Sequence, residues 1–263
     1  MKKAAVMVSD GRMKVIVREL AGAGFEVLAC TQLDELEEME RRALEWDVLI
    51  LPIRGIDSEG NASIPGVSFP MQKTLAELRP EAQVITGLQT DYLKSLQREV
   101  KCYFEDEQVR RKNVQLTAEG ILYLLLKETT KSIFEQSIDL VGYGYVGQAA
   151  HELLTKVGIS HRIVDKHEKI TDDGVQVMSL ETWKKTAPAE VIINSAPVLV
   201  ADEETTARWQ EKTFFIDIAS GAVGADAKTK ERIRYLAAPP LPGLVAEESA
   251  GKMLADYILR QFG

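Results

Sequence analysis

Residues that bind metals or carry redox chemistry are scarce in this chain of 263 residues. Its two cysteines, Cys30 and Cys102, lack the spacing of a metal or redox site, and its three histidines are scattered along the sequence. We therefore predict no metal site. So few cysteines also indicate a reducing compartment, and we expect a cytoplasmic protein.

Positive charge is limited as well. The 32 lysines and arginines are outnumbered by 40 aspartates and glutamates, which gives a net charge of −8 and an isoelectric point near 5.1. Nucleic-acid phosphates are bound by clustered basic side chains, and the sequence has no such stripe. We therefore expect no nucleic-acid partner.

Long hydrophobic runs are missing too. No apolar stretch approaches the roughly 18 residues of a membrane-spanning helix, so we expect no membrane partner. The apolar run at residues 4–8 follows two lysines, as in a signal peptide, but it stops at Ser9 and Asp10. We interpret it as a first β-strand.

The composition that remains, 45% hydrophobic and 27% charged, is typical of a soluble globular protein. The length suits one large domain or two of ordinary size.

Residues 138–147 read Ile-Asp-Leu-Val-Gly-Tyr-Gly-Tyr-Val-Gly, an apolar strand followed by the spacing of a dinucleotide-binding fingerprint. In this reading Gly142 permits a tight turn, Gly144 lets the backbone approach a pyrophosphate, and Gly147 lets the next helix pack closely on the strand. The pyrophosphate would sit on the helix N-terminus. The predicted cofactor contacts in this segment are Gly142, Gly144, Tyr145, Val146 and Gly147.

The residues after the glycines support this reading. A helical stripe of apolar residues ends at Gly158, and a short strand at 161–164 leads to Asp165. An acidic residue about 20 positions beyond the fingerprint is expected to bind the adenosine ribose. Asp165 therefore favours NAD over NADP, whereas Lys166 and His167 weaken that preference. The alternative is that the three glycines form only a tight strand-to-helix turn.

The first 110 residues repeat a strand-then-helix rhythm that predicts a parallel sheet. The segments expected are 4–8, 14–23, 25–29, 34–45, 47–52, 69–78, 82–86 and 92–99. The loops after the strands, at 9–13, 53–60 and 87–91, should face a ligand.

A long helix from Leu116 to about Phe134, with Thr117 as its N-cap, is predicted to precede the fingerprint. Six strands then match a doubly wound nucleotide domain; they are expected at 138–141, 163–164, 175–177, 191–194, 214–218 and 233–236. After the proline-rich segment 239–243, an amphipathic helix at 247–261 should pack back on the first domain.

The sequence thus predicts an α/β protein of two Rossmann-like, doubly wound parallel-sheet domains. The first would be an N-terminal substrate domain, residues 1–115 with the C-terminal helix 246–263. The second would contain the linking helix and an NAD(P)-binding domain, residues 116–245.

Charged residues follow the first and third strands of the N-terminal half. Asp10 and Arg12 lie in a predicted ligand-facing loop, although Asp10 as a helix cap beside a solvated Arg12 is an equally good interpretation. Arg54 could bind a carboxylate with two hydrogen bonds, but a plain surface arginine is the commoner outcome.

Two strand ends in the second half are expected to line the nicotinamide site. The residues there are Asn194, Ser195, Ala196 and Pro197, and then Asp217, Ala219 and Ser220. Small residues leave room for a flat ring, and Ser220 can hydrogen-bond a carboxamide; an ordinary strand-to-loop turn is the alternative. Glu119, one turn into the predicted long helix, is either a general acid or base or a carboxylate favoured by the helix dipole.

These segments, in this order, resemble the A-subunit family of dipicolinate synthases, the sporulation enzymes whose product accumulates in bacterial spores. The matching segments are 10–12, 50–55, 59–60, Asn113 with 117–120, the fingerprint, 193–197, 216–220, and 241–246 with 250–251. The most specific are Thr-x-Glu-Gly at 117–120 and Leu-Pro-Gly-Leu-Val-Ala at 241–246.

The resemblance implies NAD(P)-dependent oxidation of a dihydrodipicolinate-type heterocycle, or its hydrated precursor, to the aromatic dicarboxylate. It also implies that the partner is a flavoprotein-like B subunit and that the location is the mother cell of a sporulating bacterium, and a homo-oligomer is expected. A dianionic substrate calls for arginine, and Arg12 is the matched candidate. Thr117, Glu119 and Ser220 complete the predicted catalytic set with Asp10 and Arg54.

Three positions depart from the family's usual pattern. Gly221, Ala222, Val223 and Gly224 stand where Arg-Pro-Gly usually follows the Ala-Ser. Arg54 replaces a small hydroxyl residue, and Tyr145 replaces an arginine inside the fingerprint. The alternatives are that the guanidinium has moved from one loop to the other, that the substrate has changed, or that activity has been lost. Two rival hypotheses therefore stay open: another two-domain dehydrogenase acting on a small hydroxy or amino acid, and a non-catalytic nucleotide-binding subunit.

Overall fold

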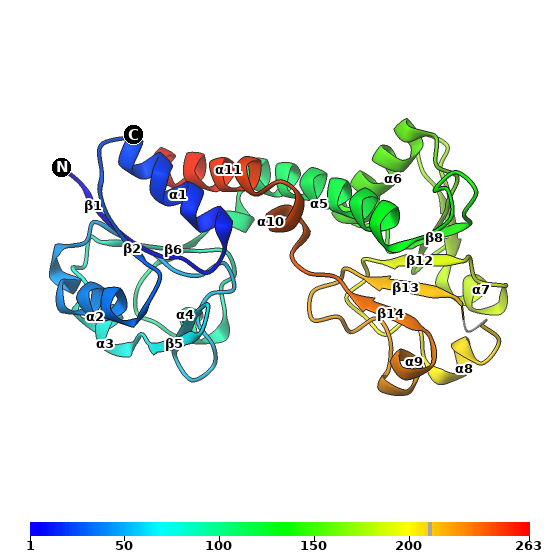
Figure 1. The fold of residues 1–263 in the computed structure, drawn as a ribbon, viewed down its shortest axis with the longest axis horizontal. Helices are drawn as coiled ribbons and strands as arrows, with labels where there is room; N and C mark the ends of the chain where they lie inside the picture. The colour runs from blue at the N-terminus through cyan, green and yellow to red at the C-terminus, as the bar shows by residue number, and fades with distance from the viewer. Residues whose placement is uncertain (210–211) are drawn as a thin grey trace. The chain divides into compact units, whose positions relative to one another are not determined.

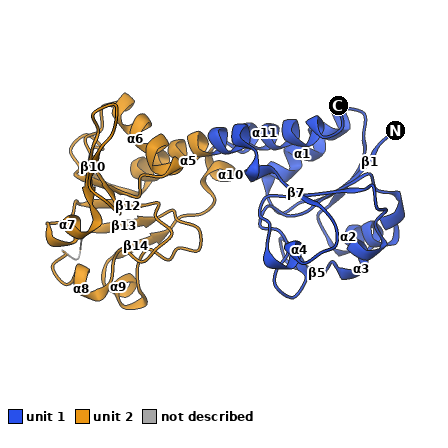
Figure 2. Cartoon of the chain, turned by 180° about the vertical axis from the view of Figure 1, so that it is seen from behind, with its two compact units in different colours: residues 1–113, 246–263 blue, residues 114–245 orange. Residues whose placement is uncertain are grey.

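The computed structural model describes residues 1–209 and 212–263 and confirms an α/β fold with two parallel sheets (Figure 1). The chain divides into two compact units (Figure 2). Unit 1 contains residues 1–113 and 246–263, and unit 2 contains residues 114–245. The chain therefore passes between the units twice.

Unit 1 is built on a five-stranded parallel sheet of order β2-β1-β3-β6-β7. Its strands are β1 (Lys3–Met7), β2 (Glu26–Cys30), β3 (Val48–Ile50), β6 (Gln83–Thr86) and β7 (Val100–Cys102). Its helices are α1 (Gly11–Gly22), α2 (Leu33–Arg41), α3 (Gln72–Glu77), α4 (Asp91–Lys94) and α11 (Glu247–Arg260), with short 3-10 turns at Ala43–Glu45 and Tyr103–Glu105.

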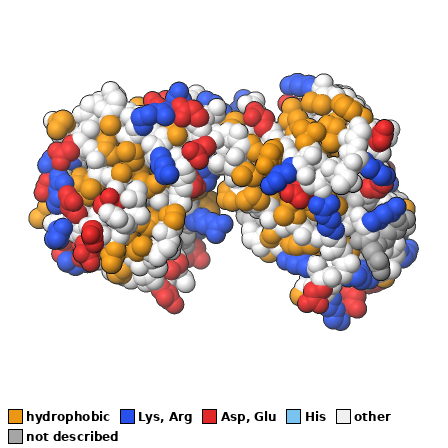
Figure 3. All heavy atoms as spheres, viewed as in Figure 1, with side chains coloured by type: hydrophobic (Ala, Val, Ile, Leu, Met, Phe, Trp, Pro, Cys, Tyr) orange, Lys and Arg blue, Asp and Glu red, His pale blue; other side chains and the backbone are white. Residues whose placement is uncertain are grey.

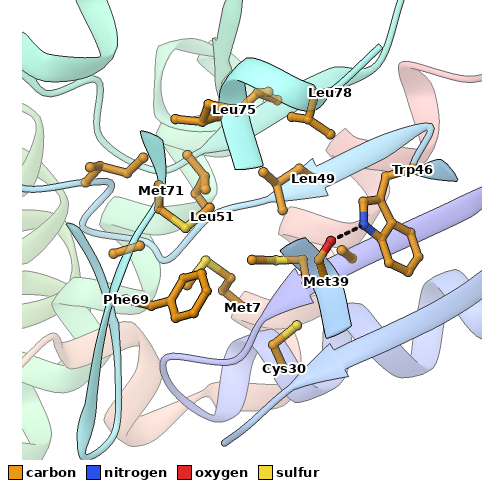
Figure 4. Close-up of a cluster of buried hydrophobic side chains, with 14 of the residues drawn as sticks. Met7, Cys30, Met39, Trp46, Leu49, Leu51, Phe69, Met71, Leu75 and Leu78 are labelled. Carbon is orange, nitrogen blue, oxygen red and sulfur yellow. Dashed lines mark hydrogen bonds between the residues drawn. The ribbon is translucent and has the colours of Figure 1, made fainter. Parts of the chain in front are cut away.

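Alternating side chains of the sheet build two separate cores in unit 1, because successive strand residues point to opposite faces. In β1, Ala5 and Met7 join the core under α2 and α3, and Ala4 and Val6 join the core under α1 and α11. The first core includes Trp46, whose indole Nε1 donates to the Met39 carbonyl at 2.9 Å (Figure 4).

Helices α1 and α11 lie side by side, as expected for the C-terminal helix (Figure 1). A Cβ atom on Gly251 of α11 would lie 2.4 Å from the Val15 Cβ and 2.8 Å from the Arg12 carbonyl oxygen of α1. Only glycine lets the two helix backbones approach so closely.

Unit 2 contains a seven-stranded sheet of order β10-β11-β9-β8-β12-β13-β14. The strands are β8 (Ile138–Val141), β9 (Arg162–Asp165), β10 (Lys169–Ile170), β11 (Gln176–Ser179), β12 (Val191–Asn194), β13 (Phe214–Asp217) and β14 (Arg234–Ala237). All neighbours pair in parallel except β10, which pairs antiparallel with β11.

Helices cover both faces of this sheet. They are α5 (Glu107–Glu128), α6 (Tyr145–Val157), α7 (Leu180–Lys185), α8 (Glu203–Thr206), α9 (Ala227–Arg232) and α10 (Leu241–Val245). Ile193 of β12 packs with α5 and α6, whereas Ile192 packs with Trp183 of α7 on the other face. Trp183 stands edge-on to Trp209, so both act as packing residues.

The prediction for the long helix was wrong at both ends. Helix α5 begins at Glu107 rather than Leu116 and ends at Glu128, so Phe134 lies beyond it. Asp106 is the actual cap: its carboxylate accepts from the Val109 amide at 2.9 Å. Thr117 is therefore in the middle of the helix and is not an N-cap, and Glu119 is far from the first turn, where the dipole would favour a carboxylate.

Several other elements differ from expectation. The predicted loop after β3 contains a hairpin, β4 (Asn61–Ile64) and β5 (Val67–Pro70), so Phe69 is in a strand and helix α3 starts only at Gln72. Strands β7 and β10 were not predicted, which makes the second sheet seven strands rather than six. Helix α4 is shorter than the predicted segment 92–99.

The surface is mixed in charge. On the face shown in Figure 3, basic and acidic side chains are interspersed over both units. Of the helices in the two described ranges, none combines the length and apolarity needed to cross a membrane.

Candidate functional site

The three fingerprint glycines sit in different surroundings at the carboxyl edge of the unit 2 sheet. Gly142 has φ +95°, and a Cβ atom there would lie 2.6 Å from the Ser195 Oγ. A Cβ atom on Gly147 would lie 2.0 Å from the Gly142 carbonyl oxygen. Around Gly144, in contrast, a Cβ atom would meet nothing within 4 Å among the described residues. Two glycines are thus required by packing, and the third faces open space.

Gly144 is also the N-cap of α6, which begins at Tyr145. The first amide groups of a helix have no partner within the helix and carry the positive end of its dipole. An anion approaching the α6 N-terminus would therefore meet the unobstructed face of Gly144. Val146 is half-buried, and the Tyr145 side chain is 64% exposed beside this position.

Asp165 is the last residue of β9, the strand next to β8. Its carboxylate lies 3.3 Å from the Lys169 Nζ. Lys166 and His167 follow it and are exposed. The residue expected to bind a ribose is therefore half-buried and already has a cationic partner.

Asn194 and Asp217 end the neighbouring strands β12 and β13 and face each other in register. The Asn194 Nδ2 donates to the Asp217 carboxylate at 2.9 Å, and both side chains are buried. Asp217 also accepts hydrogen bonds from the Ala219 and Gly224 amides at 3.3 and 2.8 Å and from the Tyr235 hydroxyl at 2.9 Å.

This network holds the loops after β12 and β13 in place. The Asn194 and Asp217 side chains are buried in it and do not face solvent. The side-chain Nδ2 of Asn194 donates to the Ala196 carbonyl, and its Oδ1 accepts from the Ala196 N–H. The side chain therefore holds the start of the loop after β12. Burial, followed by the bond and charge of Asp217, raises the pKa of Tyr235 and keeps its hydroxyl protonated. Sequence reasoning did not identify Tyr235, because it is distant in the chain from the strand end that it supports.

The remaining predicted nicotinamide-site residues lie at the same sheet edge. The Ser195 hydroxyl donates toward the Val141 and Gly142 carbonyl oxygens, at 3.1 and 3.2 Å, which ties this loop to the fingerprint turn. Pro197 and Ser220 are exposed, and Ala219 is half-buried. The structure therefore brings the fingerprint, the 195–197 loop and the 219–220 loop to the ends of adjacent strands.

The segment where the family's arginine is missing has an unusual backbone. Ala222 has φ +49°, and it is the one non-glycine residue with positive φ in the described ranges. Its carbonyl oxygen accepts from the Lys230 Nζ at 2.8 Å and the Tyr235 hydroxyl at 3.1 Å. Left-handed backbone at alanine costs free energy, so these contacts help to hold it.

A second polar group lies at the carboxyl edge of the unit 1 sheet. Asp10 is the N-cap of α1 and accepts from the Arg12 amide at 3.0 Å. The Arg12 guanidinium donates to the same carboxylate through Nε at 3.2 Å and Nη2 at 2.6 Å, and only 4% of Arg12 is exposed. The interpretation of Asp10 as a cap is confirmed, but the solvated Arg12 that accompanied it was wrong.

Tyr103, directly after β7, was not identified from the sequence. Its ring is fully buried, and its hydroxyl has no hydrogen-bond partner among the described residues. Burial raises the pKa of this hydroxyl, which therefore stays a donor. A Cβ atom on Gly87, in the loop after β6, would lie 2.9 Å from it. The one sequence feature that could have identified Tyr103 is its position as an aromatic residue directly after a strand.

The other predicted site residues lie after β3 and on α5. Arg54 follows β3 and is exposed, and no described residue hydrogen-bonds its guanidinium. Glu119 is exposed on α5, and Thr117 is half-buried. The Gly120 beside them has a structural explanation, because a Cβ atom there would lie 2.4 Å from the Leu241 Cβ of α10.

Comparison with known proteins confirms the resemblance noted in the sequence. No family model matches the chain. It is 24% identical, over 97% of its length and 94% of the relative, to the A subunit of dipicolinate synthase from Bacillus subtilis (strain 168). The crystal structure of the A subunit of dipicolinate synthase from Bacillus halodurans superposes with a TM-score of 0.82 at 22% identity, covering 99% of this chain and 97% of that one.

More distant structures share the fold. D-Lactate dehydrogenase from Salmonella has a TM-score of 0.68 at 13% identity, with 99% of this chain and 95% of that chain covered. NAD+-bound 3-phosphoglycerate dehydrogenase from Entamoeba histolytica has a TM-score of 0.55 at 15% identity, with the same coverage of both chains. The fold is thus of the dehydrogenase type.

Proposed function

We propose that this chain is an NAD(P)-dependent oxidoreductase that oxidises a dihydrodipicolinate-type heterocycle, or its hydrated precursor, to dipicolinate. The single observation that carries the proposal is the geometry of the fingerprint. Gly142 and Gly147 close the turn, and Gly144 leaves an open face at the α6 N-terminus, in a chain that is similar along 97% of its length to the A subunit of dipicolinate synthase.

The residues of unit 2 fit a nicotinamide dinucleotide. The open face of Gly144 would accept the pyrophosphate, with Tyr145 and Val146 providing the next amides. Asp165 would accept hydrogen bonds from the ribose hydroxyls. The loops at 195–197 and 219–220, held by Asn194 and Asp217, would receive the nicotinamide. When bound, the oxidised cofactor supplies a hydride acceptor.

The residues of unit 1 fit a carboxylate-bearing substrate. Arg12 is held rigidly by Asp10, the Tyr103 hydroxyl is a buried donor without a partner among the described residues, and Arg54 is an exposed guanidinium at the same sheet edge. Ligands of parallel sheets bind outside the carboxyl ends of the strands, where all four residues lie. A pyridine-2,6-dicarboxylate has two carboxylates, which suits two arginines.

The proposed reaction requires the protein mainly to orient the substrate ring against the cofactor and to accept a proton. The dihydropyridine ring loses a hydride and a proton to become aromatic, and aromatisation supplies the driving force. Glu119, an exposed carboxylate on α5, is the proposed proton acceptor. Thr117, half-buried on the same helix, and Ser220 are proposed to hydrogen-bond the reactants.

Partner and location are part of the proposal. The relative in B. subtilis is the A subunit of its synthase, which supports a partner for this chain, expected to be a flavoprotein-like B subunit. We also propose a homo-oligomer, and the cytoplasm of the mother cell in a sporulating bacterium as the place of action.

The test is a direct assay of product. Purified protein, alone and with a candidate B subunit, is given enzymatically generated dihydrodipicolinate precursor with NAD+ or NADP+. We expect reduced nicotinamide and dipicolinate to form in equal amounts and both to be lost in Gly144→Val. Cofactor reduction with small hydroxy or amino acids, without dipicolinate formation, would instead establish the rival dehydrogenase.

That rival has one observation in its favour. Gly221, Ala222 and Val223 replace the arginine-containing segment expected of the family, while the fold is shared with D-lactate dehydrogenase. If cofactor binds but no substrate turns over with or without the B subunit, a non-catalytic nucleotide-binding subunit is the remaining interpretation.

A further inference from the structure

We propose that Lys169 lets the cofactor site accept NADP(H) as well as NAD(H). This inference rests on the proposed binding of a dinucleotide at the fingerprint. Its starting point is the ion pair between the Lys169 Nζ and the Asp165 carboxylate, 3.3 Å apart, with 45% and 30% of the side chains exposed. Both groups are therefore within reach of a ligand.

The sheet places Lys169 on the same face as Asp165. Lys169 of β10 faces Val177 of β11, and Val177 faces Ile163 of β9, so the three side chains point to one side. Asp165 lies two residues beyond Ile163 and points to that side as well. The ion pair is thus set by strand pairing, and not by a flexible loop.

A pinned turn holds β10 in this register. The Thr171 amide donates to the Val175 carbonyl at 3.0 Å, the Thr171 hydroxyl accepts from the Val175 amide at 3.0 Å, and Gly174 has φ +83°. The Thr171 hydroxyl also donates to the Asp173 carboxylate. The carboxylate that forms the ion pair with Lys169 is that of Asp165.

The Lys169 ammonium also reaches back toward the fingerprint. Its Nζ lies 5.6 Å from the centre of the Tyr143 ring, and Tyr143 packs with Ile163 and Val177 in a small buried cluster. Tyr143 stands between Gly142 and Gly144. The Lys169 ammonium therefore lies near both the fingerprint turn and the carboxylate of Asp165, which is proposed to bind the ribose.

The charges explain why this position decides cofactor choice. A lone Asp165 would accept the ribose hydroxyls of NAD(H) and repel the 2′-phosphate of NADP(H), which carries about −1.5 to −2 charges at neutral pH. Lys169 cancels the carboxylate charge, and its flexible ammonium can turn to the phosphate. With NAD(H) bound, it stays with Asp165. The site is then built to bind both cofactors.

The experiment compares NADH and NADPH affinities of the whole protein by fluorescence titration. We expect wild-type dissociation constants within about ten-fold of each other, and in Lys169→Met a selective weakening of NADPH by about ten-fold or more. Asp165→Asn should shift the ratio the opposite way. Raising the ionic strength should reduce the Lys169 effect, because these charges are partly exposed.

Lys185→Met is the matched control, because Lys185 also forms an ion pair with a carboxylate four residues earlier in the chain, that of Glu181 on α7 of the same unit. It should leave both affinities unchanged. An unchanged NADPH to NADH ratio in a folded Lys169→Met protein that binds both cofactors would overturn this inference alone. Binding of neither cofactor by the wild type would instead overturn the proposed function, and this inference with it.

Discussion

A methyl group on Gly147 would lie 2.0 Å from the carbonyl oxygen of Gly142, so α6 packs directly against the turn that follows β8. The same substitution at Gly144 would touch nothing within 4 Å among the described residues. Glycines of one motif therefore have separable roles.

We expect Gly147→Ala to lower the free energy of unfolding by about 1–3 kcal/mol, because the overpacked methyl must displace backbone. Gly144→Val should cost no more than about 1 kcal/mol, mainly through a poorer N-cap, yet weaken NADH binding by at least about ten-fold. Urea unfolding and titration calorimetry on the two variants measure both quantities. Unchanged NADH affinity in folded Gly144→Val would remove the pyrophosphate assignment.

Arg54 and Arg12 should respond differently to truncation. Arg54 is exposed, so Arg54→Ala should keep the melting temperature and cofactor affinity but weaken dipicolinate binding by about ten-fold or more. Arg12→Ala should also destabilise the fold, because it leaves Asp10 without its partner. If wild-type protein with cofactor binds no dipicolinate, with or without the B subunit, the altered segment 221–223 has changed the substrate.

Two tyrosines offer a matched comparison. Tyr103→Phe removes a buried hydroxyl that has no partner among the described residues, so the free energy of unfolding should stay the same or rise. Tyr235→Phe removes a donor to the Asp217 carboxylate and should cost about 1.5–3 kcal/mol. Chemical denaturation measures both. A loss of stability in Tyr103→Phe would mean that its hydroxyl has a partner in solution.

Asp217→Asn should damage the loops that are proposed to receive the nicotinamide. Four donors converge on the Asp217 carboxylate, and an amide nitrogen in place of either oxygen faces two of them. We expect a loss of about 2 kcal/mol or more and a weaker NADH affinity. Asp57→Asn, at an exposed turn of unit 1, is the control and should leave NADH affinity intact.

His161 should make stability depend on pH near neutrality. Its Nδ1 donates to the Ile159 carbonyl at 2.8 Å, so in the neutral ring Nε2 accepts from the His151 Nδ1, also at 2.8 Å. Burial lowers the pKa of His161 below its usual 6.5, and the neighbouring His151 also lowers it. The unfolded chain therefore binds the proton more readily, so this contribution is present above pH 6.5 and is lost as the pH falls below it.

The measurement is the melting temperature between about pH 8 and pH 5.5 for the wild type and His161→Gln. The wild type should lose stability more steeply on acidification. Equal slopes in the two proteins would show that His161 does not titrate in this range.

The sequence by itself determined the features that depend on a few adjacent residues. Glycine spacing after an apolar strand defines the fingerprint turn, because positive φ at Gly142 and absence of a side chain at Gly147 are local requirements. Alternation of strands and helices predicted a parallel sheet in each half, and a helix cap was one of the two interpretations of Asp10. These are short-range steric and hydrogen-bonding preferences, which a linear pattern carries.

Tertiary structure decided whatever depends on distant segments. The polar first turns of α5 contain few apolar residues, and Arg260 of α11 supports them through Gln108 and Asp106. Asn194 and Asp217 were predicted to line a binding site, but only strand register shows that each satisfies the other. Lys169 pairs with Asp165 only because β10, too short to give a pattern, adds to the sheet edge. Such contacts depend on packing between segments that are far apart in the sequence, because local propensity does not determine which strands become neighbours.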